Sequence, residues 1–259
     1  MVGSLILRGL VVGLFAGLLA FGYARVYGEP SLDSAIAFEE LLAAAEGEIT
    51  TAEDAAGAAD HEEEVVVSRE VQSSIGLLTG TAVLGAGLGG IFAVLFALAN
   101  GRIGRLGPQQ TSLLLAALCF VSVFLVPWLK YPANPPASTD DTTVQLRTSL
   151  FLLMMAVSIG AMIGSWVLRQ RLLNKYGSWN ASLIGAGAYV VVIGVFALLL
   201  PTVSETPADF PAVVFWDFRM ASLGTNFVLW ATIGLAFGFV VERTMIGSQM
   251  PARRTAAAN

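Results

Sequence analysis

Long apolar stretches alternate with short charged islands along this chain. The stretches without Asp, Glu, Lys or Arg cover residues 9–24, 71–101, 106–129, 148–168, 176–204 and 220–241. A helix needs about 20 apolar residues to cross the hydrocarbon core of a bilayer. The last five stretches meet this length directly. The first is shorter, but the long side chains of Arg8 and Arg25 reach the membrane interfaces, so this span extends over residues 4–26.

The pattern predicts an all-α integral membrane protein, a six-transmembrane-helix bundle that forms one membrane domain. The expected spans are residues 4–26, 74–99, 109–129, 149–168, 181–201 and 220–241. Composition agrees, because 13% of the residues are charged, against about 25% in soluble domains. A secretory signal peptide is a second interpretation of the first span. Arg25, Tyr27 and Glu29 crowd the expected cleavage region and disfavour it.

The loops between these spans fall into two sets of opposite charge. One set holds most of the basic residues and a single acid, Glu242. Its basic residues are Arg8, Arg102, Arg105, Arg169, Arg171, Lys175, Arg243, Arg253 and Arg254. The other set holds the remaining acids. Because basic loops stay in the cytoplasm, both termini are expected there, in a multi-pass protein of the inner (plasma) membrane surrounded by lipid. No feature predicts nucleic-acid binding.

Glycines recur four residues apart in several spans. The pairs are Gly9/Gly13, Gly13/Gly17, Gly76/Gly80, Gly85/Gly89, Gly160/Gly164 and Gly234/Gly238. Such spacing lets helix backbones approach closely, so we expect each pair at a helix–helix contact. Residues 105–114 also resemble residues 175–184, and each segment opens a span that ends at prolines. Either a parallel repeat of helical hairpins or convergent helix-entry chemistry explains this similarity.

The longest acidic loop, residues 28–73, is expected to begin with a short amphipathic helix over residues 31–45, followed by a mobile segment. It ends in five residues with metal-binding side chains: Asp60, His61, Glu62, Glu63 and Glu64. Carboxylates with one imidazole suit a divalent ion such as Co²⁺, so they are a candidate capture site. A solvated acidic linker is the alternative. Further carboxylates are expected at the entrance of the bundle: Glu29, Glu39, Glu40, Glu205 and Asp209.

The spans contain no Asp, Glu, Lys, Arg or His near their midpoints, which disfavours a proton relay. Thr225 and Asn226 are the intramembrane polar residues selected as a candidate site. Cys119 is the single cysteine, so the sequence has no disulfide framework and no paired-thiol metal motif. No phosphate-binding loop or hydrolase motif occurs, and we therefore expect neither an enzyme nor a tightly bound cofactor.

Several segments resemble the CbtA family over nearly the whole chain. They are residues 8–40, SREVQSSIGLLTG, LVPWLKYPANPP, KYGSWNASL, ADFPAVVFWDFRMASLGTN and VLWATIGLAFG. The resemblance implies a membrane subunit linked to cobalt uptake for cobalamin, often paired with a small single-span CbtB subunit that bears a histidine-rich metal site. The acidic loop departs from the family, because it carries only His61 where similar proteins are richer in histidine.

Two functional hypotheses follow. In the first, the chain is part of a divalent-cation uptake system whose acidic loops gather the ion, with Co²⁺ as the expected cargo. In the second, it is a non-transporting membrane scaffold whose glycine stripes and proline-rich loops serve assembly with a partner protein.

Overall fold

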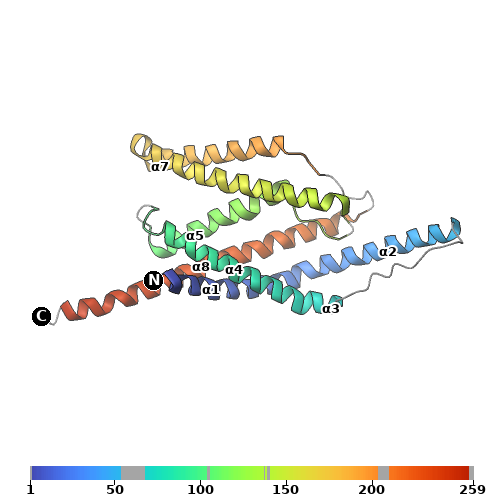
Figure 1. The fold of residues 1–259 in the computed structure, drawn as a ribbon, viewed down its shortest axis with the longest axis horizontal. Coiled ribbons are helices and arrows are strands. Elements are labelled where there is room, and N and C mark those ends of the chain that lie inside the picture. The colour runs from blue at the N-terminus through green and yellow to red at the C-terminus, as the bar shows by residue number, and fades with distance from the viewer. Residues whose placement is uncertain are drawn as a thin grey trace.

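The computed structural model describes residues 2–53, 68–103, 106–136, 138, 141–203 and 210–256, and the regular structure in them is helical. The elements are α1 (Val2–Tyr23), η1 (Ala24–Gly28), α2 (Glu29–Glu53), α3 (Arg69–Val71), η2 (Gln72–Gly76), α4 (Leu77–Ala99), α5 (Pro108–Cys119), η3 (Phe120–Leu125), α6 (Val126–Lys130), α7 (Asp141–Leu199) and α8 (Ala212–Ala256). Elements marked η are π-helical turns that continue neighbouring α-helices without a break (Figure 1).

Within the described residues, five continuous helices are long and apolar enough to cross a membrane. They cover Gly3–Ala44, Arg69–Ala99, Pro108–Lys130, Thr143–Leu199 and Ala212–Thr244. This supports the predicted membrane helical bundle.

One of the five, α7, reverses direction and is a helical hairpin. Its apolar part has 57 residues, which would extend about 85 Å if straight, far beyond a hydrocarbon core of about 30 Å. Gly177 has a φ of 74°, a left-handed conformation that glycine adopts without steric cost. The two arms then run side by side (Figure 1). The hydroxyls of Ser158 and Tyr189 lie 2.7 Å apart across them, and Arg169 Nε donates to Ser182 Oγ at 2.8 Å.

Glycines bring α1 and α4 into backbone contact. A Cβ added to Gly13 would lie 2.1 Å from the carbonyl oxygen of Gly85, and one added to Gly89 would lie 2.2 Å from that of Gly9. No side chain fits at these distances, so the predicted packing role of this stripe is confirmed. Gly234 and Gly238 of α8 similarly face Ala116 and Gln109 of α5.

The core lies among α1, α4, α5 and α8. Phe92 and Phe96 of α4 pack edge-to-face on Phe237 of α8, with ring centroids 5.4 and 5.2 Å apart. Ser112 Oγ of α5 donates to the Gly234 carbonyl oxygen at 2.7 Å, which satisfies a buried hydroxyl in the same core. The α1–α8 contact has a polar end as well, where Arg8 Nη1 donates to Thr244 Oγ1 at 3.1 Å.

The α7 hairpin packs beside this core, against α6 and η3. A smaller apolar cluster joins them and contains Val126, Tyr131, Leu150 and Met154. Most of α7 is exposed to the surroundings of the chain. Gly160 and Gly164 have open space where a Cβ would be added, and so does Gly80. The packing role expected for the pairs Gly160/Gly164 and Gly76/Gly80 is therefore wrong for the described part of the chain, because no other helix described there reaches them.

The acidic segment after the first span is more helical than the sequence pattern predicted. No separate short helix begins near Ser31; instead α1, η1 and α2 form one uninterrupted helix that continues to Glu53. Part of the segment expected to be mobile is thus helical, because its alanines and glutamates are good helix formers. The first half of α2 lies along the start of α8, where Ala35 is fully buried and the rings of Phe38 and Phe210 meet edge-to-face at 5.2 Å.

Candidate functional site

The candidate site lies at one end of the bundle, which we call the acidic end. It comprises α2, α3, the proline-rich segment 131–136 and the first turns of α8, which come together on the right of Figure 1. The described acids Glu29, Asp33, Glu39, Glu40, Glu70 and Asp217 belong to these elements. The opposite end, with the 100–103 turn and the Gly177 reversal, carries mostly basic side chains.

An ion network joins α2 to α3 at this end. Arg69 Nη2 donates to Glu29 Oε2 and, at 2.8 Å, to Asp33 Oδ1, which also accepts from Arg69 Nε at 3.1 Å. Arg25 lies 3.9 Å from Glu29 on the next turn. Glu29 is only 6% exposed. A carboxylate at this depth needs a close cation, so Glu29 belongs to a structural pair that holds α3 against α2.

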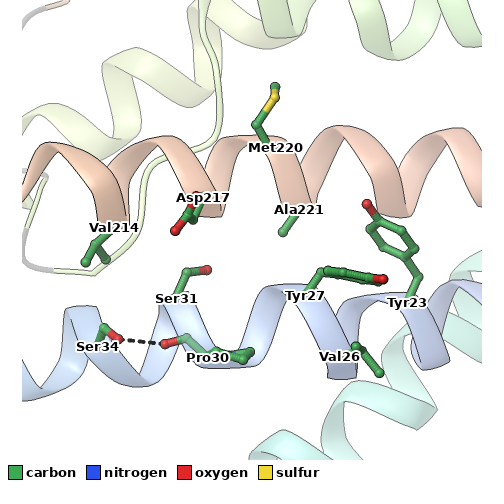
Figure 2. Close-up of a pocket in the computed structure, with 10 residues that line it drawn as sticks. All are labelled: Tyr23, Val26, Tyr27, Pro30, Ser31, Ser34, Val214, Asp217, Met220 and Ala221. Atoms are coloured by element: carbon green, nitrogen blue, oxygen red, sulfur yellow. Dashed lines mark hydrogen bonds between the residues drawn. The ribbon is translucent and has the colours of Figure 1, made fainter.

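A hollow of about 410 Å³ opens between the α1–η1–α2 helix and α8. Its walls consist of Tyr23, Val26, Tyr27, Pro30, Ser31, Ser34, Val214, Asp217, Met220 and Ala221. Figure 2 shows Asp217 on α8 directed toward Ser31 on α2, with the two tyrosines at one side. The π-helical turn η1 forms part of the wall, and such turns occur frequently at functional sites. The hollow therefore combines one carboxylate, hydroxyl groups and apolar walls.

A second hollow of about 460 Å³ adjoins the first, because Tyr23 and Met220 line both. The rest of its lining is apolar and comprises Phe120, Leu125, Leu223, Gly224 and Phe227. Tyr23 lies directly against Gly224, where an added Cβ would be 2.2 Å from the phenolic oxygen. The tyrosine ring thus stands between a polar hollow and an apolar one.

The proline-rich segment is fixed over the acidic end by three side chains that the sequence reasoning did not single out. Tyr131 donates from its hydroxyl to the Pro201 carbonyl oxygen at 2.7 Å, and burial raises the pKa of this phenol, which keeps it a donor. Arg147 donates to the Pro132 carbonyl oxygen. Arg219 donates to Asn134 Oδ1 at 3.0 Å. Arg147 and Arg219 could have been found from their positions in the sequence. Each directly precedes a predicted span, where its helix meets the proline-rich segment.

The structure describes three of the five expected entrance carboxylates, and their exposure differs. Glu29 is buried in its ion pair with Arg69, whereas Glu39 and Glu40 are exposed farther along α2. Glu205 and Asp209 lie outside the described residues. So do all five candidate capture residues, Asp60, His61, Glu62, Glu63 and Glu64. Within the described part of the chain, no three His, Cys, Asp or Glu side chains form a group suited to hold a metal ion.

The intramembrane polar pair is bonded within its own helix. Thr225 Oγ1 donates to the Ala221 carbonyl oxygen at 2.8 Å, and Asn226 Nδ2 donates to that of Ser222 at 3.1 Å. Each of the two side chains thus donates a hydrogen bond within its own helix, without a second helix. Asp217, one of the acids assigned to the acidic face from sequence, is the carboxylate that lines the hollow, and only tertiary packing distinguishes it from the others.

Comparison with curated proteins and with solved structures gave no significant match. A family model matches residues 2–242, which include every element that forms the core and the acidic end. The model is that of CbtA, described as a probable cobalt transporter subunit. The chain, a multi-pass helical membrane protein by its apolar helices, therefore belongs to the CbtA family.

Proposed function

We propose that this chain is the membrane-spanning component of a divalent-cation uptake system, with cobalt as the cargo. The observation that carries the proposal is the family match over residues 2–242. The segregation of acids to one end of the bundle supports it, because a negative field raises the local concentration of cations. The same family description, a probable transporter subunit, supports a role in transport.

The proposed topology has six crossings, with the two arms of α7 counted separately. The basic end then faces the cytoplasm with both termini, and the acidic end faces outward from the inner membrane. Inward movement of a doubly charged ion through 100 mV is favourable by about 4.6 kcal/mol. Facilitated entry thus needs no tightly bound cofactor in this subunit.

A family described as a subunit implies a partner. The partner we propose is a small single-span protein of the CbtB kind, whose helix would pack in the membrane against this chain. The five residues Asp60, His61, Glu62, Glu63 and Glu64 remain candidate capture groups for the incoming ion, together with the exposed Glu39 and Glu40 and with Glu205 and Asp209.

Cobalt accumulation in cells tests the proposal. Cells that lack their own cobalt importers should accumulate radioactive Co²⁺ when they express this chain with its partner, and should lose most of that uptake when the chain is omitted. A matched strain that expresses the chain with all five residues 60–64 changed to their amide or alanine equivalents measures the capture contribution. Equal cobalt content with and without the chain would contradict the function.

The second candidate is a non-transporting scaffold. The open faces of α7, with free space at Gly160 and Gly164, favour it, because small residues permit a further helix to approach. A stable complex with a membrane partner, formed while cobalt accumulation stays unchanged, is the result expected of a scaffold. Loss of cobalt uptake on removal of the chain would exclude a purely structural role.

A further inference from the structure

Asp217 is the acid among the residues that line the hollow, and it differs from the acids Glu29 and Asp33 on α2. Arg69 pairs with both Glu29 and Asp33, and Arg25 approaches Glu29 as well, so two cations face two carboxylates on the α2 side. That network has no net charge. Asp217, across the hollow on α8, is exposed and takes part in no ion pair among the described residues. The uncompensated negative charge at this hollow is therefore its own.

The hydroxyl groups of the hollow are oriented to accept hydrogen bonds. Ser31 Oγ donates its proton to the Gly28 carbonyl oxygen at 2.8 Å, and Ser34 Oγ donates to that of Pro30 at 2.8 Å. Each hydroxyl keeps lone pairs free once its single proton is used. Water molecules bound to a metal cation are donors. The two serines thus match the hydration shell of a cation rather than the bare ion.

The size of the hollow fits a hydrated ion. A water molecule occupies about 30 Å³ in the liquid, so a shell of six waters needs about 180 Å³, well below the 410 Å³ of the hollow. A single carboxylate is too few ligands to replace such a shell, since structural metal sites use four or more. The apolar hollow beyond Tyr23 offers fewer polar groups still, so an ion that keeps its waters stops in the first hollow.

We propose that the hollow between α2 and α8 is the docking site for a hydrated divalent cation, with Asp217 as the attracting charge and Ser31 and Ser34 as acceptors for its water. The proposal rests on the proposed function and deepens it, because it names the place and the form in which the cation first binds. A divalent ion is favoured over a monovalent one, since the attraction to the carboxylate doubles with charge.

Calorimetric titration of the purified full chain with Co²⁺ tests the site. We expect the D217N variant to bind Co²⁺ about tenfold more weakly, because the attracting charge is removed, while D217E binds within about twofold of the unaltered chain. E40Q is the matched control, since Glu40 is an exposed carboxylate on α2 outside the hollow. Equal affinity of D217N and the unaltered chain would overturn the proposal.

The exchange-inert ion hexaamminecobalt(III) tests whether the shell is retained, because it cannot release its ligands. It should compete with Co²⁺ for binding to the unaltered chain. In D217N this competition should disappear. Failure to compete would mean that the ion sheds its waters, which also overturns the proposal.

Cobalt uptake measured with the same variants separates the two ideas. Uptake by the unaltered chain with no change in D217N would leave the proposed function intact and overturn the docking site. A chain that binds Co²⁺ through Asp217 without any uptake would support the docking site and contradict the function.

Discussion

A buried carboxylate needs a cation beside it to offset its lost hydration, and Glu29 illustrates this at the scale of one residue. Its partner Arg69 lies 40 positions away in the sequence. Little in the local pattern around Glu29 predicts a different environment from that of Glu39 or Glu40, because all three are acids in the segment that follows the first apolar span. Packing of α3 against α2 makes the difference, and sequence alone could not give it.

Arg69→Ala should therefore destabilise the protein by about 3 kcal/mol, because it removes the closest cation from the buried Glu29 carboxylate and leaves only Arg25, which is 3.9 Å away. The double variant Arg69→Ala/Glu29→Gln should recover much of this loss, since no buried carboxylate remains to be stabilised and Asp33 is exposed. Arg25→Ala is the control, because Arg25 is half exposed and 3.9 Å away. The measurement is the free energy of unfolding in a fixed detergent. A double variant as unstable as the single one would contradict the buried-charge explanation.

At the scale of elements, glycine spacing located helix contacts only in part. The stripe of Gly9, Gly13 and Gly17 lies against α4, as its spacing predicted. Gly160 and Gly164 have the same spacing and face open space. Spacing shows that a close approach is allowed, but the second helix that makes the approach is a property of the tertiary structure. The Gly177 reversal was likewise expected only as a loop between spans, whereas helix continues on both sides of one left-handed residue.

Gly13→Ala and Gly85→Ala should each destabilise the α1–α4 contact by about 1–3 kcal/mol, because the added methyl group meets backbone atoms that cannot move aside. Gly87→Ala supplies the matched control on the same helix, since nothing lies within 4 Å of its added Cβ. It should be neutral or slightly stabilising, because alanine favours helix over glycine. Thermal unfolding in detergent compares the three. Equal losses at Gly85 and Gly87 would show that close packing is not the cause.

At the scale of the whole molecule, the apolar segments and the charge pattern indicated the membrane bundle, and both are simple consequences of the bilayer as a solvent. The candidate site was harder to predict from the sequence. The hollow arises because α2 continues the first span and lies along α8. This arrangement brings Ser31 and Asp217, which are far apart in the sequence, into one lining. The acids that the sequence pattern selected as candidate site residues are instead buried in an ion pair, exposed elsewhere on α2, or outside the described residues.

The six-crossing topology leads to a test in which the two ends of the α7 hairpin report the same side. The native Cys119 is first replaced by serine, and single cysteines are introduced at Gln145, Asn174 or Thr202, which are all exposed. If each arm of α7 crosses the membrane, Gln145→Cys and Thr202→Cys should react with an impermeant maleimide added outside right-side-out vesicles. Asn174→Cys should react only after the membrane is opened.

The contrast between Gln145 and Thr202 decides between the hairpin and a single crossing. A straight α7 would place these two residues on opposite sides, so only one of them would react from outside. Glu40→Cys adds the orientation, because α2 belongs to the acidic end and should react from outside as well. Reaction of Asn174→Cys in sealed vesicles, with protection of Glu40→Cys, would invert the proposed orientation and place the Asp217 hollow on the cytoplasmic side, where it could not receive an incoming ion.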